Sequence, residues 1–213
     1  GLLTYPIIRP SFIGLEDRGY PFARVAGLLI LSYVVWLAGS FRFPFQRLTI
    51  TFAFLLMFVC SLLLASRQKN ELQREWNERK GYFFAIEGLF FLFFLVDVLI
   101  RIGNPDLWHP WKGGEKPMDF SYFNAILKST SFPPYDPWFA GGYINYYYYG
   151  FVFVGVLVKW LGIVPSIAIN LIIPTIFAMI ALGAFSVGWN LVNRSQGGEL
   201  LQRLKQFKTT ITS

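Results

Sequence analysis

The stretch LTITFAFLLMFVCSLLLAS, residues 48–66, decides the fold class because its 19 residues include no charged side chain. A helix of about 20 mostly apolar residues is long enough to cross a lipid bilayer. Uncharged runs of similar size recur at residues 25–41, 137–158 and 160–193. The whole chain of 213 residues is 54% hydrophobic and 15% charged, whereas a soluble domain has about 25% charged residues. The sequence therefore predicts an integral membrane protein.

We expect an all-α, polytopic transmembrane helical bundle of about five spans, with four segments along the chain. Residues 1–102 hold three spans and a polar connector at residues 67–80, in which five Lys or Arg side chains indicate the cytoplasmic side. Residues 103–143 form a long extracytoplasmic loop with a short interfacial helix. Residues 144–193 form two further spans, and residues 194–213 a basic amphipathic tail. These features predict a multi-pass protein of the plasma (inner) membrane.

The charge balance indicates which kinds of partner the chain could bind. Lys and Arg number 19 against 12 Asp and Glu, which gives a net charge of +7. The basic residues are scattered around the apolar runs, so they suit anionic membrane lipid better than nucleic acid. Cys60 is the single cysteine, so the chain forms no internal disulfide and has no cysteine-based metal site. We expect no cofactor, with divalent metal dependence left open.

Ionisable residues interrupt the third span. Asp97 and Arg101 lie four positions apart, which predicts an ion pair within one helix face. Glu87 has no partner in its own helix, so it either pairs with a neighbouring helix or has a functional role. Arg24, near the start of the first span, is expected to extend back to the interface.

Five full crossings do not give a consistent orientation in the membrane. Counting spans from a cytoplasmic connector places the loop outside, and it also places the basic tail outside, which the positive-inside rule disfavours. Either one span is re-entrant, or the chain is part of a longer protein whose further helices correct the count.

Two motifs in the loop carry a resemblance. They read GGEKPMDF at residues 113–120 and FPPYDPWFAGGYINYYYYG at residues 132–150. This pattern resembles the uncharacterised YYY-domain membrane proteins of bacteria and archaea, which are in turn similar to the membrane-embedded GT-C glycosyltransferases. The resemblance implies transfer of a sugar from a lipid-phosphate-linked donor. It also implies that Asp119 is the base or substrate orienter, with Glu115 as the second candidate, although the usual acids are adjacent and these are not.

Such a transfer needs a carboxylate to accept a hydroxyl proton, a cation near the departing phosphate, and aromatic surfaces against sugar and lipid. Asp119 is the candidate carboxylate and Lys116 the candidate cation. The remaining candidates for substrate binding are Trp108, Trp111, Trp138, Tyr143 and Asn145.

Plainer explanations stand beside these roles. Asp119 before an apolar turn is also a good helix N-cap, with no catalytic duty. His109 is either a hydrogen-bonded loop residue or a metal ligand, and the tyrosines at residues 146–149 form either an interfacial belt or a substrate platform. The alternative to an enzyme is a non-catalytic transmembrane subunit packed within a larger membrane protein complex. A transporter fits less well, because the ionisable residues do not line up along several spans.

Overall fold

The computed structural model describes the backbone of residues 1–104 and 116–211, and the side chains of these residues up to residue 193. Helices make up most of this part of the chain, and an isolated antiparallel bridge between Tyr135 and Tyr143 is its only β pairing. The prediction of an all-α membrane bundle with about five apolar helices is confirmed.

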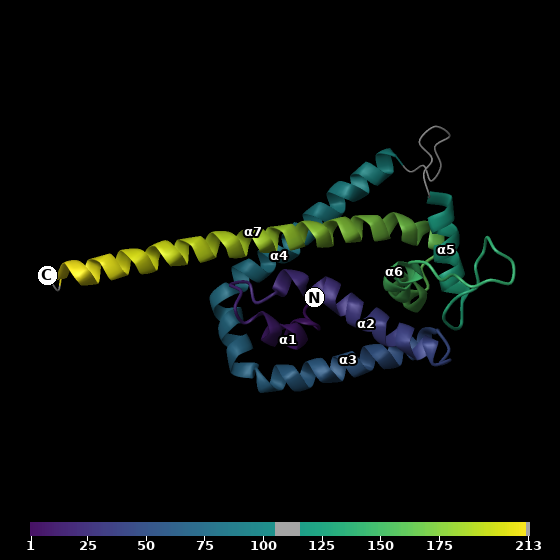
Figure 1. The fold of residues 1–213 in the computed structure, drawn as a ribbon, viewed down its shortest axis with the longest axis horizontal. Helices are drawn as coiled ribbons and strands as arrows, with labels where there is room; N and C mark the ends of the chain where they lie inside the picture. The colour runs from purple at the N-terminus through teal and green to yellow at the C-terminus, as the bar shows by residue number, and fades with distance from the viewer. Residues whose placement is uncertain (105–115, 212–213) are drawn as a thin grey trace.

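The helices follow one another along the chain with short connections, apart from the loop region (Figure 1). In order they are α1 (Tyr5–Ile8), the 3-10 helices η1 (Arg9–Phe12) and η2 (Tyr20–Phe22), α2 (Ala23–Ser40), α3 (Arg47–Arg67), α4 (Lys69–Gly103), α5 (Lys116–Lys128), α6 (Tyr148–Leu161) and α7 (Pro165–Ile211).

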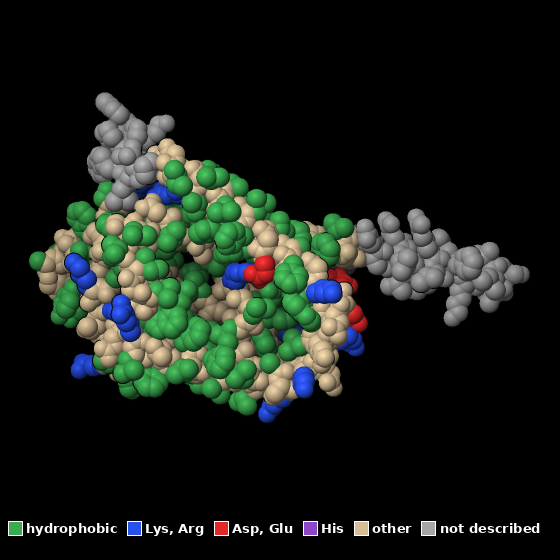
Figure 2. All heavy atoms as spheres, turned by 180° about the vertical axis from the view of Figure 1, so that it is seen from behind, with side chains coloured by type: hydrophobic (Ala, Val, Ile, Leu, Met, Phe, Trp, Pro, Cys, Tyr) green, Lys and Arg blue, Asp and Glu red, His purple; other side chains and the backbone are tan. Residues whose placement is uncertain are grey.

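Four of the described segments are long and apolar enough to cross a membrane. They are Tyr20–Ser40, Arg47–Arg67, Lys69–Gly103 and Pro165–Asn193. Large apolar side chains on them point away from the molecule, as on α3, where Phe52 is 63% exposed. Figure 2 shows hydrophobic side chains over most of one face, with charged ones sparse across its middle. A helix that is apolar all round and yet exposed is suited to lipid.

The polar connector is the first part of α4, and a kink separates it from the span. Arg79 has φ −127° and ψ 19°, outside the helical region, so the helix changes direction there. The N-terminal segment docks on the connector through a buried polar cluster. Arg9 Nη2 lies 2.7 Å from Glu75 Oε1, and the Tyr5 hydroxyl donates to Glu75 Oε2 at 2.9 Å. Burial, with the Glu75 carboxylate beside it, raises the pKa of Tyr5 and keeps the phenol a donor.

α4 and α7 pack against each other in opposite directions. Their contacts pair the end of one span with the start of the other: Phe93 with Phe177, with ring centroids 6.1 Å apart, and Tyr82 with Trp189, 5.3 Å apart. The span of α7 therefore starts beside the loop end of α4 and finishes beside the connector.

Polar groups within these spans bond between helices. Arg24 donates to Glu87 of α4, which also accepts from the Tyr20 hydroxyl at 2.6 Å, so Glu87 does pair with a neighbouring helix. Arg24, which was expected to extend back to the interface, thus pairs with a carboxylate of α4. The expected ion pair of Asp97 and Arg101 is wrong. Arg101 instead donates to the Asn170 side chain of α7 at 2.5 Å, since α7 lies closer to its guanidinium.

α6 lies across the bundle rather than along it. At its start, the Tyr148 hydroxyl accepts from Trp36 Nε1 at 2.9 Å, near the end of α2. At its end, Trp160 Nε1 donates to the Thr51 hydroxyl at 3.0 Å, in the second turn of α3. Since α2 ends and α3 begins at the same hinge, both ends of α6 lie at one end of the bundle. Figure 1 agrees, because α6 is seen end-on while α2, α3 and α7 are seen lengthwise.

Its length supports this geometry. The sequence places a full span at residues 144–161, whereas the helix has 14 residues, which is about 21 Å at 1.5 Å per residue. The hydrocarbon core is about 30 Å thick. α6 is thus the short apolar helix of the bundle.

Candidate functional site

The helix α5 carries the candidate acid Asp119, and this helix begins earlier than the sequence suggested. The helix includes Lys116, and Pro117 lies in its first turn, where the missing N–H costs nothing. Asp119 is the fourth residue of α5, inside that turn, so the expectation that it is the N-cap is wrong. A carboxylate in the first turn still interacts favourably with the helix dipole. Asp119 is partly buried.

The apolar stripe of α5 faces the bundle. Phe123 is fully buried and packs in one cluster with Val158 of α6 and Ala168 of α7, and Phe120 and Leu127 lie at the edge of this cluster. Ile126, also fully buried, belongs to the larger core with α2, α3 and α6. The interfacial helix of the prediction is therefore held on its neighbours by its apolar side.

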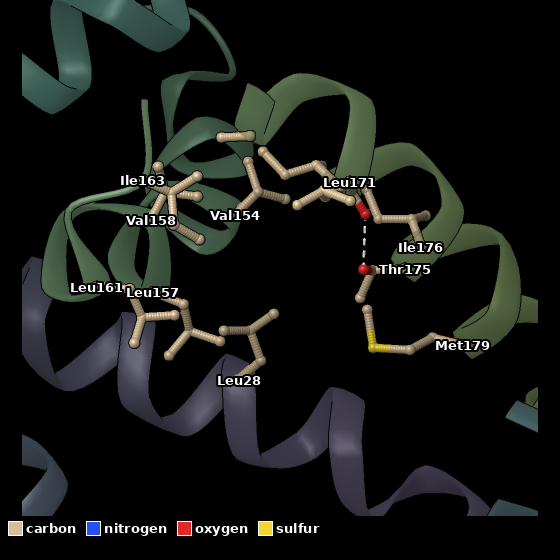
Figure 3. A pocket seen from close by; sticks show the side chains of 12 residues that line it. Leu28, Val154, Leu157, Val158, Leu161, Ile163, Leu171, Thr175, Ile176 and Met179 are labelled. Carbon is tan, nitrogen blue, oxygen red and sulfur yellow. Dashed lines mark hydrogen bonds between the residues drawn. The ribbon is translucent and has the colours of Figure 1, made fainter. Parts of the chain in front are cut away.

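A partly open apolar cavity lies next to the cluster under α5. It has a volume of about 170 Å³ and lies between α2, α6 and α7, as Figure 3 shows. Its one polar lining side chain is Thr175, whose hydroxyl donates to the Leu171 carbonyl at 2.7 Å and so presents its methyl group. The cavity wall shares five residues with the cluster under α5: Val154, Val158, Ile163, Ala168 and Ile172.

Asp119 therefore lies about one helical turn from the residue of α5 that packs on the cavity wall. Asp119 precedes Phe123 by four residues, so the two lie on the same face of α5, about one turn apart. The Phe123 ring rests on Val158 and Ala168, which line the cavity. Lys116 lies in the same first turn as Asp119. A carboxylate and a cation thus lie at one end of a helix whose apolar side packs on residues that line an apolar cavity.

The hairpin after α5 positions two further candidates. The Asp136 amide donates to the Gly142 carbonyl at 3.0 Å, and the Ile144 amide donates to the Pro134 carbonyl at 2.9 Å. Gly141 has a φ of +80°, which the turn requires and which glycine adopts without strain. The hairpin joins the Lys128 end of α5 and projects away from the helices (Figure 1).

The predicted aromatic residues lie on the surface of this hairpin. Trp138 is 64% exposed, and Tyr143 stacks on Tyr135 with ring centroids 4.7 Å apart. Asn145, two residues after the bridge residue Tyr143, is exposed. The remaining candidates, Trp108, Trp111 and Glu115, lie outside the described residues, as does His109.

The tyrosine run divides into two parts that the sequence did not separate. Tyr148 and Tyr149 hold α6 on α2, through the bond from Trp36 and through a contact of 3.1 Å between the Tyr149 and Ser32 hydroxyls. Tyr146 is 69% exposed. Two of the four tyrosines are therefore packing residues. The signal in the sequence is that Ser32 and Trp36, their partners, lie four residues apart on one face of the first span.

Metal binding has no support among the described residues, which include no cluster of three or more His, Cys, Asp or Glu side chains that could hold an ion. The predicted residues that the structure describes offer the Asp119 carboxylate, the Lys116 ammonium group and apolar or aromatic surfaces. This set can accept a proton and bind an amphipathic anion.

Residues 30–211 match a family described as uncharacterized membrane protein (DUF2298). The chain belongs to this family. The match covers α3 to α7 and most of α2, so the bundle, α5 and the hairpin all fall within it. No curated protein and no solved structure matches the chain.

Proposed function

We propose that this DUF2298 protein is a membrane-embedded glycosyltransferase of the GT-C kind, which uses a sugar linked to a lipid phosphate. The observation that carries the proposal is the position of Asp119, one turn from the Phe123 ring that rests on the wall of an apolar cavity. A lipid-linked sugar matches this arrangement, because it has a polar reacting group joined to a long apolar chain.

The proposed orientation follows from the four long helices. If the connector is cytoplasmic, α4 leads to the outer side, and α7 returns from there to the inner side because it runs antiparallel to α4. α6 does not change sides, since both of its ends lie near the α2–α3 hinge. The basic tail then lies in the cytoplasm with the connector, as the positive-inside rule prefers. α5 and the hairpin lie outside.

The proposed reaction is a displacement at the anomeric carbon of the donor sugar. The Asp119 carboxylate accepts the proton of the acceptor hydroxyl, the hydroxyl oxygen bonds to the anomeric carbon, and the bond to the phosphate oxygen breaks with its electron pair. Lys116, in the same turn, offsets the charge that develops on the departing lipid phosphate. Trp138 and Tyr143 supply exposed rings for the sugar faces.

The test is transfer from polyprenyl-phosphate-linked hexoses, radiolabelled in the sugar, by membranes that contain the protein. We expect Asp119→Asn to lower the rate by about 10² to 10⁴ at equal abundance, the usual contribution of a general base. Glu78→Gln is the matched control, because Glu78 is an exposed acid of the connector. An Asp119→Asn protein as active as the wild type would refute the role of Asp119.

The alternative function is an outcome of the same experiment. A non-catalytic subunit would show no turnover of any of these donors, would co-purify with stoichiometric membrane partners, and would support their activity equally with Asp119 or Asn at this position.

A further inference from the structure

Two basic residues line one hollow at the hinge end of the bundle, away from Asp119. An open hollow of about 490 Å³ is lined there by Gln46, Arg47, Leu48 and Lys159. Arg47 is the first residue of α3 and Lys159 lies in the last turn of α6. Neither takes part in the ion pairs of the described residues, so their two positive charges have no carboxylate partner there.

The Lys159 ammonium group is held in place by neutral groups. It donates to the Ser129 carbonyl at 2.6 Å and lies 4.1 Å from the centre of the Phe45 ring. An ammonium group has three N–H donors, and the contact with Ser129 uses one of them. The group is thus fixed in position, and two of its three donors remain for an anion.

The Arg47 guanidinium lies against the C-terminal end of α6. Its Nε donates to the Lys159 carbonyl at 3.3 Å. Gly162 follows α6 with a φ of +72°, which favours glycine, and a Cβ atom there would displace the end of the Arg47 side chain. The two outer nitrogens of the guanidinium can bind two oxygens of one phosphate.

An apolar groove begins where this hollow ends. It has a volume of about 530 Å³, lies between α2 and α3, and shares Gln46 and Leu48 with the hollow. From Leu48 to Leu56 it follows α3 for eight residues, which is about 12 Å. Its walls below the hinge are apolar side chains of both helices, among them Val34, Val35, Ala38, Phe52, Ala53 and Leu56.

We propose that this end of the α2–α3 pair binds an anionic phospholipid of the bilayer, with its phosphate on Arg47 and Lys159 and one acyl chain in the groove. The charge of the hollow selects an anion, and the continuity of the groove selects one that carries a hydrocarbon chain. A free phosphate would use the cations and leave the groove empty.

This site is separate from the proposed reaction. Ser129, the partner of Lys159, follows Asp119 by ten residues along α5, which is about 15 Å at the helical rise. A sugar phosphate bound by Arg47 and Lys159 would therefore not place its anomeric carbon at Asp119. The bound lipid would instead join α3, α6 and the end of α5.

The experiment measures retention of radiolabelled phosphatidylglycerol, and separately of phosphatidylcholine with the same acyl chains, by the detergent-purified protein. Removing each cation should weaken phosphatidylglycerol binding about fivefold, and the Arg47→Gln, Lys159→Gln double variant about 25-fold, from about 1 kcal/mol per basic residue near a phosphate surface. The control is Arg42→Gln with Lys128→Gln, which removes two exposed cations outside the hollow.

A second variant tests the groove without changing charge. Ala38→Phe places a ring in the groove wall, and we expect it to reduce phosphatidylglycerol retention while both cations remain. Equal retention by the Arg47 and Lys159 double variant and the wild type would overturn the proposal, as would an equal loss in the control. Displacement of the lipid by inorganic phosphate alone, or unchanged retention in Ala38→Phe, would show a small-anion site and would also overturn it. Activity of Asp119→Asn has no bearing on these results.

Discussion

Removing the Phe123 ring should release α5 from the bundle while the long helices stay folded. Phe123 is fully buried and contacts Val158 and Ala168, so Phe123→Ala leaves a void that these neighbours cannot fill. Truncating a buried Phe costs about 3–5 kcal/mol. Because about 1.4 kcal/mol corresponds to a factor of ten, the local opening equilibrium of α5 should rise by about two to nearly four orders of magnitude.

Hydrogen exchange of the protein in lipid nanodiscs measures this directly. The amides of α5 should exchange faster in Phe123→Ala by that factor, and those of α4 and α7 should not change. Lys128→Ala, at the exposed end of the same helix, is the control and should leave exchange of α5 near the wild-type rate. Unchanged protection of α5 in Phe123→Ala would refute the claim that this ring holds the helix on the cavity wall.

Two further substitutions test the packing at either end of the bundle. Arg9→Ala leaves the buried Glu75 carboxylate without its guanidinium, so the free energy of unfolding should fall by about 3–5 kcal/mol. The Arg9→Met, Glu75→Leu double variant leaves no unpaired charge, so it should be more stable in detergent than Arg9→Ala. A double variant no more stable than Arg9→Ala would contradict this reasoning. Gly39→Ala would place a Cβ atom 2.5 Å from the Phe132 ring, so the thermal midpoint should drop by an amount typical of overpacking, about 1–3 kcal/mol, and a midpoint equal to that of the wild type would show that the ring simply moves.

The long apolar runs were enough to predict the helices. Residues 48–66 could be nothing but a span, and α3 occupies Arg47–Arg67. The polar connector was also predicted, because its composition changes sharply after Ser66. The sequence did not decide whether α6 crosses the membrane, since the apolar run at residues 137–158 is long enough to do so. Its hairpin and the bonds of Tyr148 and Tyr149 to α2 decide its direction, and these are contacts between distant parts of the chain.

The candidate site was predicted in part. The apolar stripe of α5 follows from the spacing of Phe120, Phe123 and Leu127, and it was found. The partner of Arg101 was missed, because a helical spacing of four made Asp97 the nearest acid in sequence while Asn170 is nearest in space. Arg47 and Lys159 were missed as a pair for the same reason, since 112 residues separate them.

The proposed topology depends most on α6 lying across the bundle, because this places α5 and the tail on opposite sides of the membrane. Single cysteines at positions 78, 131 and 206, in a Cys60→Ala background, can be labelled in intact cells with a maleimide that does not cross membranes. We expect Ser131→Cys to react at once, and Glu78→Cys and Gln206→Cys to react only after permeabilisation. Reaction of Gln206→Cys in intact cells, with Glu78→Cys still protected, would show that α6 crosses the membrane and would contradict the account.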